Sequence, residues 1–134
     1  MVLRVQDLDG MRRFYCEALG CIEERTREDL GLVQLRAGDS LIDLVDVQGA
    51  IGRKGGAPAG AQGRNMDHFC LRIEPYDESA IASHLAAHGA RIGDSGTRYG
   101  AQGDGPSLYV YDPEGNMLEL KAGVPAAQRP GCTP

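Results

Sequence analysis

The sequence predicts an α+β fold in which two βαβββ modules form an open, cup-shaped mixed β-sheet with helices on its outer face. Each half of the chain is predicted to contain a strand, a helix and then several short strands, and a glycine-rich stretch separates the halves. Short segments also recur: Leu3-Arg4-Val5 matches Leu71-Arg72-Ile73 at an offset of 71 − 3 = 68 residues. Such a repeat indicates two copies of one structural unit.

The composition indicates one globular domain spanning residues 1–134. Of the 134 residues 42% are hydrophobic, and 14 Lys and Arg face 19 Asp and Glu, which gives a net charge of −5. This charge argues against nucleic acid or an anionic membrane as the main partner. The sequence shows no membrane span and no signal-peptide pattern. The four cysteines include no Cys-x-x-Cys pair, so we expect reduced thiols and a cytoplasmic protein.

The first module, residues 1–47, opens with a strand over Met1–Val5. Asp7 or Asp9 caps a helix whose apolar residues recur at i, i+3, i+4, i+7 and i+8, and Gly20 ends it. Three strands are expected to follow, over Cys21–Thr26, Leu30–Arg36 and Ser40–Val47. Residues 48–65 hold six glycines and one proline, which predicts a linker with little to bury.

The second module, residues 66–122, repeats this plan. A strand runs over Asp67–Ile73, and Asp77 begins a helix that Gly89 ends. The strands expected next are Arg91–Gly93, Arg98–Gly100, Pro106–Tyr111 and Asn116–Lys121. Asp112-Pro113-Glu114-Gly115 has turn residues that predict an antiparallel hairpin. The tail, residues 123–134, contains three prolines and is predicted to be flexible or draped on a partner.

Strand alternation sorts the side chains into a core face and a polar face. Because helices cover only one side of the sheet, we expect the polar faces to line one concavity. Its predicted lining is His68, Cys70, Ser107, Tyr109, Tyr111 and Glu119, with Gln34, Arg36 and Asp43 from the first module. Arg36 and Lys121 are expected at the rim.

A histidine and a carboxylate on neighbouring strands suit a borderline divalent metal ion. His68 and Glu119 form such a pair. Two plainer interpretations remain open: His68 is an ordinary polar residue, and Glu119 pairs with Arg72 or Lys121. His84 and His88 also have a spacing that can bind metal, but we expect their helix face to be exposed to solvent.

Three segments resemble one known family, the vicinal-oxygen-chelate superfamily, over about residues 1–122. They are VLRVQDLDGMRRFYCEALG, MDHFCLRIE and SLYVYDPEGNMLELK. This superfamily contains glyoxalase I, extradiol dioxygenases, fosfomycin-resistance thiol transferases and bleomycin-resistance binding proteins. The resemblance implies a homodimer and a divalent ion (Ni, Zn, Mn or Fe) held by His68, Glu119 and Asp43. Members usually carry a further histidine on the first strand, which the repeat offset puts at position 68 − 68 = 0, one residue before Met1.

The resemblance also implies roles in chemistry. The metal chelates a substrate through adjacent oxygens, in isomerase, lyase or dioxygenase chemistry. Glu119 or Asp43 serves as the proton base, and Tyr109 hydrogen-bonds the substrate. The residues expected to bind substrate are Gln34, Arg36, Cys70, Ser107 and Tyr111. Ser107-Leu108-Tyr109 is similar to a Ser-x-Tyr that touches phosphonate in fosfomycin-resistance enzymes, so the resemblance also leaves a fosfomycin-type thiol transferase open as an alternative.

Two alternatives to a metal-dependent enzyme remain open. One is a metal-free small-molecule binding protein that resembles the bleomycin-resistance proteins, although a chain with no Trp and two Phe is poorly suited to a large stacking pocket. The other is a cup that serves only in assembly. Metal content distinguishes the metal-dependent enzyme from these two alternatives.

Overall fold

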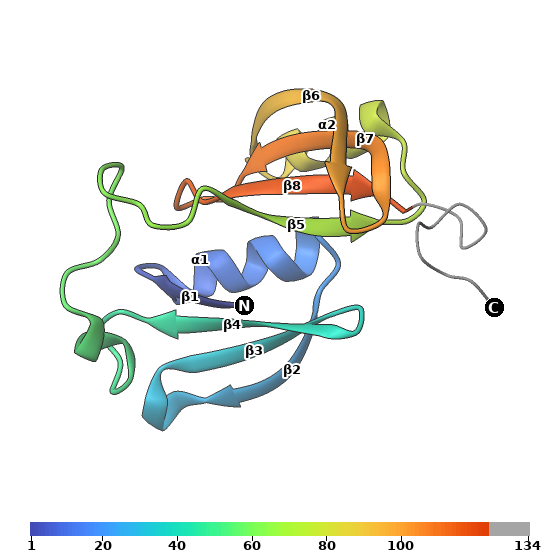
Figure 1. Cartoon of the computed structure of the whole chain (residues 1–134). Helices are drawn as coiled ribbons and strands as arrows, with labels where there is room; N and C mark the ends of the chain where they lie inside the picture. Colours follow the sequence, from blue (N-terminus) through green and yellow to red (C-terminus); the bar gives the residue numbers. More distant parts are fainter. Residues whose placement is uncertain (124–134) are drawn as a thin grey trace. The chain divides into compact units, whose positions relative to one another are not determined.

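The computed structural model describes residues 1–123 and divides into two compact units (Figure 1). The first contains Met1–Asn65 with Pro113–Gly115, and the second contains Met66–Asp112 with residues 116–123. Each unit carries its own four-stranded mixed sheet, so the α+β fold with two repeated modules is confirmed. The strands form two sheets, where the sequence suggested one. Apart from Gly123, the predicted tail lies outside the described residues.

The first unit contains strand β1 (Val2–Val5), helix α1 (Leu8–Arg13) with a π-helical extension (Phe14–Ala18), and strands β2 (Ile22–Arg27), β3 (Leu32–Ala37) and β4 (Ser40–Asp46). The sheet order is β1-β4-β3-β2, with β1 parallel to β4 and the other pairs antiparallel. Asp7 caps α1 by accepting a 2.9 Å hydrogen bond from the Gly10 N–H. A 3₁₀ turn over Glu28–Leu30 delays β3, so Leu30 is outside the strand predicted for it.

The second unit contains strand β5 (His68–Ile73), helix α2 (Glu78–Ala87) and strands β6 (Arg91–Gly100), β7 (Gly103–Tyr111) and β8 (Met117–Ala122). Its order, β5-β8-β7-β6, repeats that of the first sheet. The predicted antiparallel hairpin of β7 and β8 is confirmed. Asp112 stabilises its turn, because its carboxylate accepts 2.8 Å bonds from both the backbone and the side-chain amide of Asn116.

Strand β6 corrects one prediction. The sequence indicated two short strands, Arg91–Gly93 and Arg98–Gly100, because Gly93-Asp94-Ser95-Gly96 has the composition of a turn. The structure forms one continuous strand with a register shift between Ile92 and Ser95. A β-bulge accommodates the extra residues within the strand. Glycine suits position 93 because a Cβ there would lie only 3.0 Å from the Tyr109 carbonyl oxygen.

The glycine-rich segment is partly structured. It contains a 3₁₀ helix over Gly52–Gly55, where the sequence predicted a plain linker. The Arg4 guanidinium on β1 donates hydrogen bonds to four backbone carbonyl groups of the segment, those of Gly52, Gly55, Gly56 and Ala57. Arg4 therefore ties residues 52–57 to the first sheet.

Apolar side chains fill one side of each sheet. In the second unit Leu85 of α2 packs in the same core as the inward side chains of β7 and β8, namely Leu108, Val110, Leu118 and Leu120, all at most 2% exposed. Burying each such leucine stabilises the fold by about 1.5–3 kcal/mol. Because Leu118 and Leu120 take the core side of β8, Glu119 and Lys121 must lie on the opposite face.

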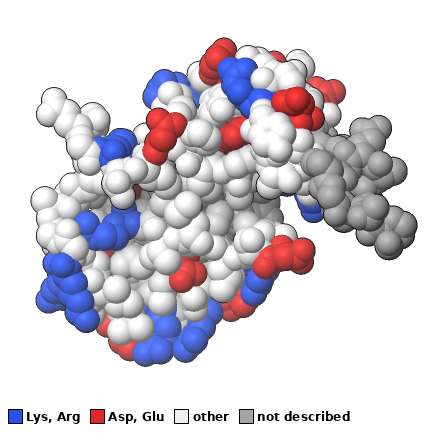
Figure 2. Space-filling model, in the orientation of Figure 1, with Lys and Arg blue, Asp and Glu red and all other residues white. Residues whose placement is uncertain are grey.

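The surface carries both signs of charge. On the face shown in Figure 2, basic and acidic side chains lie beside one another. The ion pairs of the surface include Arg27 with Asp29, and Arg12 with Glu23. None of the helices among residues 1–123 has the length and apolarity that a membrane span requires.

Candidate functional site

The polar face of the second sheet brings together side chains from three adjacent strands. Strand register sets Cys70 and Tyr109 on either side of Glu119, and Ser107 beside Lys121. His68 begins β5, next to β8. Five of the six candidates that the sequence assigned to this face in the second module therefore gather around Glu119: His68, Cys70, Ser107, Tyr109 and Glu119 itself.

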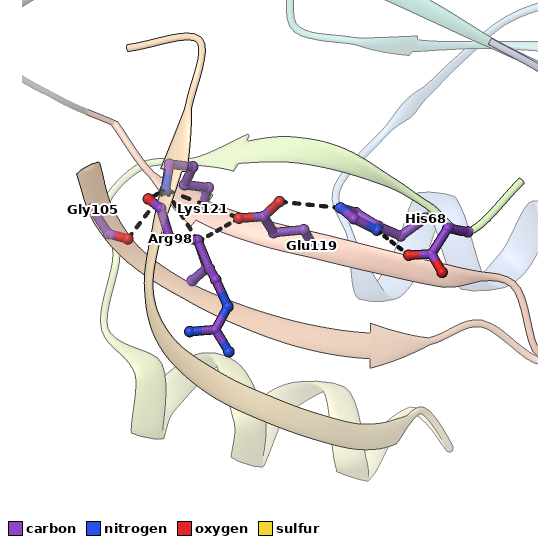
Figure 3. Close-up of polar contacts among 7 residues, drawn as sticks. His68, Arg98, Gly105, Glu119 and Lys121 are labelled. Atoms are coloured by element: carbon purple, nitrogen blue, oxygen red, sulfur yellow. Dashed lines mark hydrogen bonds and ion pairs between the residues drawn. The ribbon is translucent and has the colours of Figure 1, made fainter. Parts of the chain in front are cut away.

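His68 and Glu119 face one another (Figure 3). The His68 Nε2 atom lies 3.4 Å from the Glu119 Oε2 atom. The other ring nitrogen, Nδ1, lies 2.6 Å from a carboxylate oxygen of Asp67. An ionised carboxylate only accepts, so Nδ1 donates to Asp67, and this contact fixes the orientation of the ring.

The second oxygen of Glu119 is held by the interior of the sheet. The Ser107 hydroxyl donates a 2.6 Å hydrogen bond to Glu119 Oε1, and the Lys121 ammonium lies 4.0 Å from the same oxygen. Ser107, Glu119 and Lys121 are 0%, 6% and 7% exposed. Charges this buried require partners, and these two offset one another.

Lys121 corrects a further prediction, because it is buried and not a rim charge. Its ammonium contacts the Arg98 carbonyl oxygen, donates a 3.1 Å bond to the Gly105 carbonyl oxygen, and lies 3.3 Å from Ser107 Oγ. These acceptors come from β6 and β7, so they are far from Lys121 in the sequence. No pattern within β8 itself indicates them.

Two further side chains border this network. The Tyr109 ring meets the His68 ring edge-on, with centroids 5.3 Å apart and an interplanar angle of 84°. Cys70 is exposed as a residue, yet partial burial of its thiol, and next the negative charge of Glu119, raise the pKa of Cys70 to about 11. Cys70 is therefore a neutral thiol at physiological pH. Tyr111 lies under the Arg91 guanidinium, 3.3 Å from its ring centroid.

The first-module candidates belong to the other unit. The Gln34 side-chain amide donates to both carboxylate oxygens of Asp43, at 3.2 and 3.3 Å. Arg36 makes a two-pronged surface pair with Glu24, at 2.6 and 2.9 Å. The roles predicted for Asp43, Gln34 and Arg36 stay predictions.

The donor atoms of the second module fit part of a metal site. Two ligand atoms, each about 2.1 Å from a tetrahedrally bound ion, lie about 3.4 Å apart, which is the spacing of His68 Nε2 and Glu119 Oε2. The Asp67 contact on the far side of the ring is a common support for a metal-binding histidine. Within residues 1–123 no three His, Cys, Asp or Glu side chains are grouped closely enough to hold an ion. The module thus offers two donor atoms with a spacing that suits a metal ion.

Asp67 is the supporting residue that sequence reasoning missed. It directly precedes His68, and an acidic neighbour of a candidate metal-binding histidine was the available signal. The other histidine pair, His84 and His88, lies on α2 with ring centroids 4.4 Å apart. Both residues are exposed, as expected.

The comparisons with known proteins agree with this fold. Residues 1–120 match the profile of the Glyoxalase/Bleomycin resistance protein/Dioxygenase superfamily. A virulence protein from Salmonella typhimurium has a similar structure (TM-score 0.71, 26% identity, 92% of this chain and 93% of that chain). An integron cassette protein from the mobile metagenome of V. cholerae is also similar (TM-score 0.70, 25% identity, 92% and 91%).

A fosfomycin resistance protein, FosX from Mesorhizobium loti, shares the fold at lower identity (TM-score 0.65, 20% identity, 92% of this chain and 89% of that chain). At this identity the likeness shows the fold alone. The family profile spans both modules and ends just after Glu119. The chain therefore belongs to the Glyoxalase/Bleomycin resistance protein/Dioxygenase superfamily.

Proposed function

We propose that the second module, residues 66–122, binds one divalent metal ion through His68 and Glu119, and that the chain acts on a small molecule with two adjacent oxygens. One observation carries this proposal. Each of the two side chains uses one polar atom for support, His68 Nδ1 with Asp67 and Glu119 Oε1 with Ser107. The remaining atoms, Nε2 and Oε2, point toward one another.

The chemistry of these ligands favours a borderline ion such as Ni, Zn, Mn or Fe. When bound, such an ion acts as a Lewis acid that stabilises negative charge developing on substrate oxygens. With two ligands from the module, coordination positions stay open for both oxygens of a chelating substrate.

The surrounding residues orient the substrate. Tyr109 is half-buried and lies against the His68 ring, so its hydroxyl is the proposed hydrogen-bond donor to substrate. Cys70 presents a neutral thiol at the same face. A dioxygenase would need a set of two histidines and one carboxylate. Because the module supplies one histidine, the proposal favours isomerase or lyase chemistry.

The buried state of Ser107 weighs against a phosphonate-binding role. Its hydroxyl hydrogen is directed at Glu119 and the residue has no exposed surface. A fosfomycin-type thiol transferase therefore gains no support from this residue. Homodimerisation and a cytoplasmic location stay predictions.

A metal-free binding protein is the second candidate. One observation favours it: Lys121 already offsets the charge of Glu119 without a metal. For that candidate, small-molecule ligands would raise the unfolding temperature of protein stripped with chelator as much as that of metal-loaded protein.

A bidentate probe tests the proposed function. Acetohydroxamate offers two adjacent oxygens, and acetamide is its matched control with one. We expect acetohydroxamate to change the visible absorption of the Co²⁺-loaded protein and acetamide to leave it unchanged. Equal responses to both compounds, or none to either, would contradict chelation through adjacent oxygens.

A further inference from the structure

A directed chain of hydrogen bonds lies behind Glu119. Lys121 Nζ lies 3.3 Å from Ser107 Oγ, and Ser107 Oγ lies 2.6 Å from Glu119 Oε1. All three residues are buried on the polar face of the second sheet. The sequence placed Lys121 at the rim or as a partner of Glu119, and Ser107 was expected to contact substrate.

The direction of this chain follows from the donor inventory. A lysine ammonium donates and never accepts, whereas a serine hydroxyl has one hydrogen to give. Because Lys121 donates to Ser107 Oγ, the single hydroxyl hydrogen of Ser107 is free for Glu119 Oε1. The Arg98 and Gly105 carbonyl oxygens hold the Lys121 ammonium in place, and they belong to the backbone of β6 and β7.

This arrangement limits what Glu119 can do. Its Oε1 atom is engaged at 2.6 Å in a buried position, so only Oε2 is presented toward His68. Leaving the metal to accept a proton from substrate would require the carboxylate to rotate. That rotation would break a buried hydrogen bond to a charged group, which is costly.

We propose that Ser107 and Lys121 are positioning residues that hold Glu119 as a one-oxygen metal ligand and keep it from serving as the proton base. The inference rests on the proposed function, since it concerns the same metal site. Lys121 acts through Ser107: without the ammonium, the Arg98 and Gly105 carbonyl groups lose their donor and compete for the hydroxyl hydrogen. Ser107 then holds Glu119 less firmly.

Co²⁺ titration of four proteins tests this inference: the wild type, Ser107→Ala, Lys121→Met and the double variant. Ser83→Ala, an exposed serine of α2, is the matched control. We expect Ser107→Ala to weaken Co²⁺ affinity by about 10–100-fold, the usual effect of removing a group that supports a ligand. Its Co²⁺ absorption should also change, because the released carboxylate can offer both oxygens.

The double variant separates positioning from a general effect of charge. Lys121→Met should lower the affinity more in the wild-type background than in the Ser107→Ala background, because Lys121 acts through Ser107. Circular dichroism melting identifies any variant that fails to fold. If a protein that carries Lys121→Met is unfolded, the comparison of Ser107→Ala with the wild type decides whether Ser107 positions Glu119. Wild-type affinity and spectrum in Ser107→Ala would overturn the positioning role and leave the metal site standing. A wild-type protein that binds no Co²⁺ would instead overturn the metal site, and this inference with it.

Discussion

His68 Nε2 and Glu119 Oε2 lie 3.4 Å apart across two parallel strands. The other polar atom of each side chain is hydrogen-bonded to a different partner. The exposed Asp67 accepts a hydrogen bond from the histidine, and the buried Ser107 donates one to the Glu119 carboxylate. The pair is thereby oriented before any ligand arrives. Preorganisation of this kind is what a binding site requires of its ligand atoms.

Removing the hydrogen bond between Asp67 and His68 should weaken metal binding. In Asp67→Asn the histidine loses its carboxylate acceptor, so its ring is held less firmly and its Nε2 atom is less basic toward a metal. We expect a loss of affinity of about 10–100-fold, measured by competition with a chromogenic chelator. Asp39→Asn, an exposed carboxylate of the first unit, is the control and should match the wild type. Unchanged affinity in Asp67→Asn would show that the contact is incidental.

The Cys70 thiol should resist alkylation at mildly alkaline pH. Its pKa is raised to about 11, so the thiolate forms only as the pH approaches that value. At pH 9 its thiolate fraction should be about 50-fold below that of a thiol with the ordinary pKa of 9.0. Iodoacetamide labelling of the Cys70 peptide, followed by mass spectrometry across pH 8–11, measures the midpoint. Urea-unfolded protein is the control, and a folded-state midpoint near 9 would contradict the expectation.

Arg4 should protect the glycine-rich segment. Replacing it with alanine removes the donor of four carbonyl groups in residues 52–57. Because water can replace most of these exposed contacts, we expect a modest loss of about 1–2 kcal/mol in unfolding free energy. Hydrogen exchange should rise mainly in residues 52–57. Arg25→Ala, an exposed strand residue, is the control, and unchanged exchange in Arg4→Ala would show that the segment holds itself in place.

Leu120 should be essential to the core that fixes the site face. It is fully buried in the middle of β8, between Glu119 and Lys121 in sequence. Leu120→Ala should lower the unfolding free energy by about 2–5 kcal/mol in urea titration. Val2→Ala removes two methyl groups from a residue that is 62% exposed, and should change the unfolding free energy little. A similarly small change in unfolding free energy for Leu120→Ala would mean that β8 does not depend on this packing.

Strand alternation made the site face predictable. Leu118 and Leu120 must face the core, so Glu119 must face away from it, and the same rule applies to His68 beside Phe69. The turn at Asp112–Gly115 was equally readable, because its residues have specific backbone preferences. These are local signals, carried by neighbours in the sequence.

The features that could not be predicted depend on distant backbone atoms. The burial of Lys121 follows from the Arg98 and Gly105 carbonyl oxygens, and the order of residues 52–57 follows from Arg4. Backbone carbonyls carry no side-chain signature, so a sequence does not reveal which of them gather around a cation. The bulge in β6 was hidden for a different reason, since Gly93 and Gly96 suit a turn as well as a bulge.

Metal content per chain, measured by elemental analysis, tests the central claim most directly. The set is the wild type, His68→Ala, Glu119→Gln and the control His84→Ala, each incubated with Ni, Zn, Mn or Fe(II) and then desalted. The account predicts close to one ion per chain in the wild type and in His84→Ala, and loss of that ion in both site variants. A wild type that retains none of the four metals, or site variants that retain as much as the wild type, would contradict it.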